Sequence, residues 1–163
     1  MGRIMALDLG DMRTGVAVSD VTRSICAESF IIREGKALAL ADTVANEAEK
    51  RGVDIVVIGH QINMNGTLGP RALKAARFQD LLSYHGLNIV MWDERCTTVE
   101  AERILISTGN RREARKKKID AVAASLILES YLSRLSAGSG LFPCEKFSQP
   151  DQPDQDAEPD TQP

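Results

Sequence analysis

The stretch RIMALDLGDMRTGVAVSD, residues 3–20, decides how the chain begins to fold. It holds two runs of mainly apolar and small residues, 3–9 and 14–20, joined by a short connection that begins with Gly10. Runs of this length joined by a short glycine-containing segment predict a pair of antiparallel strands. A third run, residues 24–33, follows after another short connection. We therefore expect the chain to open with a three-stranded meander.

Helices and strands alternate in the rest of the domain. Residues 37–51 place apolar side chains at helical spacing, and residues 53–58 form a β-branched apolar run typical of a strand buried on both faces. Further elements are expected over residues 70–85 (helix), 87–92 (strand), 97–107 (helix) and 119–135 (helix). Strand–helix–strand units require parallel strands. The order β-β-β-α-β-α-β-α-α thus predicts an α/β fold with a mixed five-stranded sheet and helices on both faces.

Length and composition fit one ordinary globular domain. The chain has 163 residues, of which 43% are hydrophobic and 26% charged. No apolar run approaches the roughly 20 residues that cross a bilayer, and the N-terminus has a strand pattern, so we expect no membrane contact and a cytoplasmic location. Three widely spaced cysteines suggest neither a disulfide framework nor a zinc site. Residues 1–135 are expected to fold, and residues 136–163 to form a disordered acidic tail rich in Pro, Gln and Asp.

The charge is unevenly distributed along the chain. Beyond Ser148 all charged residues are acidic, which leaves the rest of the chain close to neutral despite the net charge of −3. A local basic cluster is compatible with phosphate-bearing partners, although a solvated charge run explains it equally well. The cluster consists of Arg111, Arg112, Arg115, Lys116, Lys117 and Lys118.

Asp8 is the first candidate functional residue. Strand alternation puts Ile4, Ala6 and Asp8 on one face, in line with residues expected in the core. A carboxylate in such a position is costly unless it is paired or binds a metal. Gly10 lets the backbone turn closely around whatever Asp8 holds. The alternative is that Asp8 only caps the hairpin turn.

Further acids follow at two other places. Asp93 and Glu94 close a strand, and alternation directs them to opposite faces, so at most one shares a site with Asp8. Asp120 is expected in the first turn of the last helix. Both placements are also explained by negative charge favouring a helix N-terminus. Carboxylates converging from separate elements, however, can hold divalent cations and support phosphodiester hydrolysis.

Several other residues could contact a phosphate backbone. The polar loop of residues 59–71 leads into a helix, and its glycines, amides and Arg71 could meet phosphate there. Arg95 has a fork geometry that suits phosphate. His60 also lies in this loop, but without an identified partner it is a weak candidate for acid–base catalysis.

Four ordered segments resemble the YqgF family, also called RuvX, the Holliday junction resolvases. They are spread along nearly all of residues 3–132, from residue 8 to residue 131. They are DLGDMRTGVAVSD (residues 8–20), NMNGTLGPRA (63–72), DERCTTVEAER (93–103) and KKIDAVAASLILESY (117–131). The chain departs from the family at His60-Gln61, where Leu-Pro is usual, at Met12, where Lys is usual, and at Cys96, where Leu or Phe is usual. No acid is lost.

The resemblance implies a ribonuclease H-like fold with acids at Asp8, in the Asp93–Glu94 pair and at Asp120, and Mg²⁺ or Mn²⁺ bound between them. It also implies a nuclease that matures the 5′ end of pre-16S rRNA, with Holliday junction resolution as the older assignment. Nucleic acid is then the partner, with pre-rRNA favoured over branched DNA, and either a monomer or a homodimer is compatible. We expect Asp8, Glu94 and Asp120 to be catalytic. The expected contacts to nucleic acid are Arg13, Arg71, Arg95 and the basic cluster.

Two alternatives remain open at this point. A non-catalytic RNA- or protein-binding module could keep the fold and use only the basic cluster. The Asp-Leu-Gly hairpin also resembles the phosphate loop of actin-like ATPases, but those need two lobes around the nucleotide and this chain provides one.

Overall fold

A computed structural model describes residues 2–60, 67, 69–93 and 112–138, with side chains in the last stretch from Ala121 onward. It contains five strands and three helices within those residues. The strands are β1 (Arg3–Leu9), β2 (Thr14–Ser19), β3 (Cys26–Ile32), β4 (Val53–His60) and β5 (Asn88–Asp93). The helices are α1 (Ala37–Arg51), α2 (Pro70–Ser83) and α4 (Arg112–Ser136).

The five strands form one mixed sheet in the order β3-β2-β1-β4-β5. β1 pairs antiparallel with β2, which pairs antiparallel with β3, so the opening meander is confirmed. β1 and β4 are parallel, as are β4 and β5. The carboxyl ends of β1, β4 and β5 therefore lie at one edge of the sheet, which is where ligands gather in sheets of this kind.

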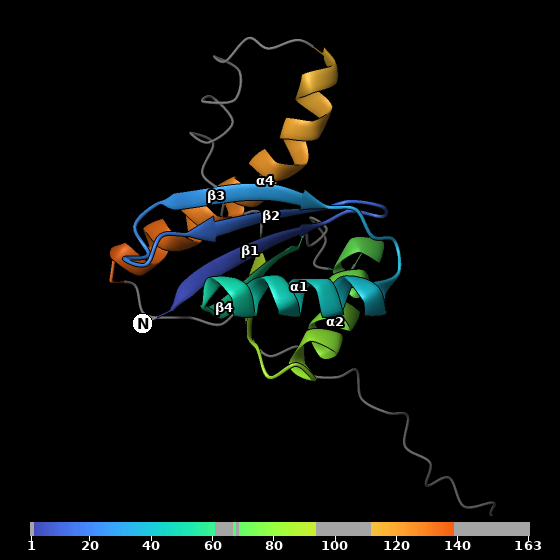
Figure 1. Cartoon of the computed structure of the whole chain (residues 1–163), viewed down its shortest axis with the longest axis horizontal. Helices are drawn as coiled ribbons and strands as arrows, with labels where there is room; N and C mark the ends of the chain where they lie inside the picture. The colour runs from blue at the N-terminus through green and yellow to red at the C-terminus, as the bar shows by residue number, and fades with distance from the viewer. Residues whose placement is uncertain (1, 61–66, 68, 94–111, 139–163) are drawn as a thin grey trace, which may run out of the picture.

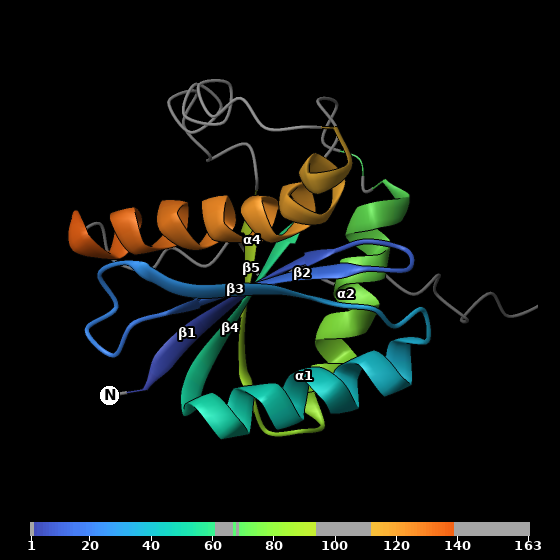
Figure 2. The same ribbon diagram turned by 45° about the horizontal axis from the view of Figure 1, so that its top comes forward.

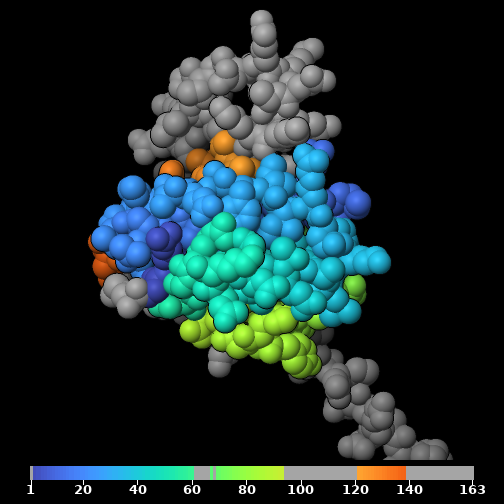
Figure 3. All heavy atoms as spheres, viewed as in Figure 1, coloured from blue at the N-terminus to red at the C-terminus, as the bar shows by residue number. Residues whose placement is uncertain are grey.

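Helices cover both faces of the sheet (Figures 1 and 2). Alternate residues of β1 separate the two cores: Met5 and Leu7 face α1 and α2, whereas Ile4 and Ala6 face α4. Seen as filled spheres, α1 lies between the meander and α2 (Figure 3). Burial of these apolar side chains supplies most of the driving force for folding.

Local sequence explains where the first two helices begin or end. α1 ends at Gly52, whose φ of 63° is left-handed and whose N–H donates to the carbonyl of Glu49. Glycine adopts that conformation without a side-chain clash. α2 begins at Pro70. Backbone N–H groups in the first turn of a helix have no carbonyl acceptor within that helix, so a proline, which lacks the N–H, is tolerated there.

Two predicted boundaries were wrong. α4 begins at Arg112 and not at residue 119, because the Arg, Glu, Ala and Lys residues at positions 112–118 are good helix formers. β4 continues through His60, which is buried in the strand and does not lie in a polar loop. The helix predicted over residues 97–107 lies outside the described residues. No described helix has both the length and the apolar character needed to cross a membrane.

Asp20 organises the turn between β2 and β3. Its carboxylate accepts hydrogen bonds from the Thr22 hydroxyl and from the backbone N–H groups of Thr22, Ser24 and Ile25. The Thr22 hydroxyl is the largest cause, followed by the Ser24 N–H, of a pKa lowered from 3.8 to about 2. Hydrogen bonds to the charged form favour that form.

The lowered pKa of Asp20 predicts a pH-dependent contribution to stability. A depressed carboxyl pKa stabilises the fold above its unfolded value and loses this effect as the pH falls through its folded value. We expect wild type to be more stable than Asp20→Asn at pH 7, and the difference to shrink between pH 4 and pH 2. Urea denaturation at a series of pH values measures it. A difference that does not change with pH would contradict this assignment.

Candidate active site

Asp8 lies near the carboxyl end of β1, on the sheet face covered by α4. Its partner on β2 is Gly15. On the other side, Leu7 pairs with Ile58 of β4, so the same register brings Gly59 beside Asp8. Neither glycine has a side chain to cover the carboxylate. Asp8 is only partly buried.

α4 crosses the same face and approaches this edge with its N-terminal half. In Figures 1 and 2 its C-terminal end points toward the start of the chain, so its first turns lie toward the end of β1. Ala124 packs in the core formed with Ile4 and Ala6. Asp120 lies about two turns inside α4, so it does not complement the N-terminus of this helix.

An aromatic contact holds α4 against the end of β5. The rings of Trp92 and Tyr131 meet edge to face with their centroids 5.3 Å apart, a favoured geometry for aromatic pairs. Burial raises the pKa of the Tyr131 hydroxyl, which stays neutral at physiological pH. The contact links α4 to the strand whose next residues are Asp93 and Glu94.

Asp93 lies on the opposite face of the sheet from Asp8. Ile89 and Met91 of β5 belong to the core under α1 and α2, whereas Trp92 packs toward α4. Alternation then places Asp93 on the α1–α2 face, where its register partner is His60. Both side chains are buried, His60 to 2% and Asp93 to 5% exposure. Glu94, the next residue, lies outside the described residues.

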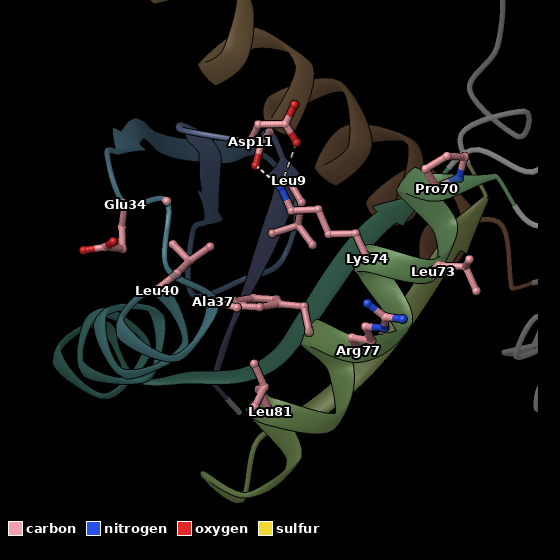
Figure 4. A pocket seen from close by; sticks show the side chains of 13 residues that line it. Leu9, Asp11, Glu34, Ala37, Leu40, Pro70, Leu73, Lys74, Arg77 and Leu81 are labelled. Atoms are coloured by element: carbon pink, nitrogen blue, oxygen red, sulfur yellow. Dashed lines mark hydrogen bonds and ion pairs between the residues drawn. The ribbon is translucent and has the colours of Figure 1, made fainter.

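The turn after Asp8 is tightly closed. The Gly10 N–H donates to the Arg13 carbonyl over 2.9 Å. A Cβ at Gly10 would stand 2.3 Å from that same oxygen, closer than any side chain tolerates. From α2, the ammonium of Lys74 donates to the Gly10 carbonyl and to the Asp11 carboxylate (Figure 4). Lys74 thus fastens the hairpin that carries Asp8 and Arg13 to α2.

The closed turn predicts a large effect of Gly10→Ala. Because the Cβ meets backbone and not a flexible side chain, the hairpin must shift. We expect a stability loss of about 2 kcal/mol from overpacking and, for the nuclease activity that the sequence resemblance implies, a loss of about 100-fold from displacing the site by about 1 Å. Urea denaturation and a cleavage assay below the melting temperature measure the two effects.

Gly86→Ala is the matched control for Gly10→Ala. Gly86 has a φ of 73° and open space around its Cα, so alanine there costs backbone strain alone, far from Asp8. We expect a stability loss of about 1 to 2 kcal/mol with activity retained. Equal activity losses in both variants would show that Gly10 acts only through stability.

Other predicted contact residues lie partly within the described region. Arg13 is half-buried in the hairpin, and Arg71 is exposed in the first turn of α2, one turn before Lys74. The five basic residues from Arg112 to Lys118 belong to α4, but their side chains are not described. Arg95 and Arg111 lie entirely outside the described residues. Sequence analysis missed Lys74. Its position three residues after Arg71, on the same helix face, was the available signal.

The described side chains do not by themselves form a metal-binding cluster. They contain no group of three or more His, Cys, Asp or Glu residues able to hold a metal ion. Asp8 is the one predicted metal ligand on the α4 face whose side chain is described. The predicted cluster with Glu94 and Asp120 therefore stays a prediction that rests on strand register and helix position.

The sheet order and the helices on both faces form a ribonuclease H-like fold, which two solved structures share. The solved structure of T. thermophilus RuvC in complex with a Holliday junction substrate is similar, with a TM-score of 0.58 at 11% identity over 85% of this chain and 98% of that one. The fowlpox virus Holliday junction resolvase gives a TM-score of 0.51 at 17% identity over 80% and 98%.

The chain belongs to the RuvX family. Residues 2–134 match the family described as RuvX, Holliday junction resolvase. A relative from Agathobacter rectalis, named "Putative pre-16S rRNA nuclease", is 42% identical over 138 residues, which is 82% of this chain and 96% of the relative. A relative from Clostridium botulinum with the same name is 41% identical over 82% of this chain and 98% of its own length. The family and the fold are of the nuclease and resolvase type.

Proposed function

We propose that this chain is a divalent-metal-dependent nuclease that processes the 5′ end of pre-16S rRNA in the cytoplasm. The observation that carries the proposal is the position of Asp8, at a carboxyl strand end, between Gly15 and Gly59, on the face that α4 covers. Support for the substrate comes from the names of the relatives, which match over most of this chain and nearly all of their own length.

Asp8, Glu94 and Asp120 are the proposed ligands of Mg²⁺ or Mn²⁺. The site fits such an ion because carboxylate oxygens suit hard cations and Asp8, which glycines flank on both sides, is only partly buried. Strand alternation favours Glu94 over Asp93, since Asp93 lies on the His60 face. When bound, the metal would activate a water molecule and stabilise charge on the departing oxygen.

The chain's own cations are proposed to position the substrate. Arg13 and Arg71 stand at the edge where β1 ends and α2 begins, and α4 carries part of the basic cluster along its first turns. Contacts of this kind bind phosphates and set the register of the nucleic acid without reading its sequence. Arg95 and Arg111 complete the proposed set from sequence alone.

Resolution of Holliday junctions is the second candidate function, because the family is described by that activity. A side-by-side cleavage assay on pre-16S rRNA and on a four-way DNA junction separates the two. We expect metal-dependent cleavage of the RNA at its 5′ end and little cleavage of the junction. Preferential junction cleavage would reverse the ranking. Binding without cleavage of either substrate would favour the non-catalytic module.

A further inference from the structure

A cleft opens between α1, α2 and the β1–β2 hairpin. Its lining includes Leu9, Gly10 and Asp11, the three residues that follow Asp8 in the sequence. It has a volume of about 380 Å³ and an apolar lining that includes Leu9, Leu40 and Phe78 (Figure 4). Ala37, at the start of α1, lines it with only a methyl group. Volumes of this order are typical of pockets that take a small organic group.

The rim of the cleft carries charge. Lys74 and Arg77 of α2 lie along one side, and Asp11 and Glu34 lie on the hairpin and α1 side. Arg77 is exposed, and its planar guanidinium can stack on a ring. Glu34 presents a carboxylate that can accept hydrogen bonds from an amino group or a hydroxyl.

A second hollow adjoins the first. It has a volume of about 360 Å³, is lined by Met12, Arg13 and Arg33, and shares Glu34 and Gly35 with the cleft. Two arginines in one small hollow suit a phosphate group, which their fork geometry can bind through paired hydrogen bonds. An apolar compartment and a phosphate-binding compartment thus lie side by side beyond the end of β1, on the α1–α2 face of the sheet and therefore on the face opposite the Asp8 carboxylate.

We propose that this double pocket binds one unpaired nucleotide of the substrate, with its base in the apolar cleft and a flanking phosphate on Arg13 and Arg33. The proposal rests on the proposed nuclease function and adds that the substrate presents an unpaired nucleotide beyond the end of β1, on the α1–α2 face and not on the face of Asp8. Unstacked bases in RNA are commonly held by apolar, aromatic or arginine surfaces. A fully paired duplex keeps its bases stacked and has none to offer.

Filling the cleft tests the base compartment. Ala37→Trp places a large ring in the lining, while Leu38→Trp adds a ring at the next residue, which is 69% exposed and does not line the cleft. The probe is a short single-stranded RNA with a central 2-aminopurine, titrated into the full chain in metal-free buffer. Anisotropy measures the dissociation constant, and 2-aminopurine emission reports the environment of the base.

We expect Ala37→Trp to weaken binding about tenfold, the scale of one lost base-stacking contact, and to abolish the emission change. Leu38→Trp should bind within about twofold of wild type. Arg33→Gln tests the phosphate compartment without touching the core. It should weaken single-strand binding more than Arg134→Gln, an exposed arginine in the last turn of α4.

Three results would overturn the assignment. One is equal binding by Ala37→Trp and Leu38→Trp, with both variants melting like wild type. Another is an equal loss on a fully paired duplex. The third concerns an acidic peptide with the sequence of residues 139–163. If this peptide displaces the 2-aminopurine base from wild type but not from Ala37→Trp, and RNA affinity stays unchanged, the cleft binds a protein segment. Binding is measured without metal or cleavage, so failure of the nuclease proposal is scored separately.

Discussion

Asp8→Asn is expected to abolish cleavage of pre-16S rRNA while leaving the fold intact. Asparagine keeps the shape of the side chain and removes the charge that a divalent cation needs. Asp8 lies near the end of β1 and is only partly buried, so the substitution leaves the packing of the core in place. We expect the cleavage rate to fall by at least about 10³-fold, the scale seen when a central catalytic group is removed, with the melting temperature within about 2 °C of wild type.

Metal uptake and RNA affinity complete the test of Asp8. Calorimetric titration with Mn²⁺ should show uptake by wild type that Asp8→Asn loses. RNA affinity in metal-free buffer should be unchanged or slightly higher, since a negative charge near the phosphates is gone. Asp42→Asn, at an exposed acid of α1 that pairs with His85, is the control and should cleave like wild type. A fully active Asp8→Asn protein would contradict the proposed nuclease mechanism.

The sheet was predictable because its strands are strongly patterned. β1 spans the residues expected from apolar alternation, and the same alternation put Asp8 on the face with Ile4 and Ala6. The end of β4 was not predictable. His60 is polar and precedes a polar loop, so nothing local distinguishes a strand residue there from a loop residue. Only its register with Asp93, across the sheet, shows why it is buried.

The start of the last helix and the residues around Asp8 were likewise not predictable from local sequence. The basic cluster was interpreted as a patch for phosphate-bearing partners or as a solvated charge run, and not as the start of the last helix, although its residues form helices readily once α4 has the sheet to pack against. The glycines beside Asp8 lie 7 residues away in β2 and far along the chain in β4, and only strand register brings them together. Lys74 likewise meets Gly10 across 64 residues of sequence. Hydrophobic alternation in the sequence predicts which face of a strand or helix a residue lies on, but which elements pair with one another depends on the whole fold.

Glu94→Gln and Asp93→Asn are expected to separate catalysis from stability at two adjacent residues. Asp93 is 5% exposed and lies on the face of His60, away from Asp8. Strand alternation in the sequence predicts that Glu94, one residue beyond β5, faces the side of Asp8 and α4. Glu94→Gln should therefore lower the cleavage rate by about 10²- to 10³-fold, as expected for a group that stabilises the transition state, with an unchanged melting temperature.

Asp93→Asn should show the reverse pattern. Removing the charge of a buried, engaged carboxylate weakens the interactions that offset its burial, at a cost of about 1 to 3 kcal/mol. Cleavage below the melting temperature should stay within about tenfold of wild type, because the change reaches the site only through the strand end. Paired urea denaturation and cleavage assays give both quantities. A stable but inactive Asp93→Asn protein, beside a fully active Glu94→Gln protein, would place Asp93 among the metal ligands and show that the alternation of β5 breaks at its end.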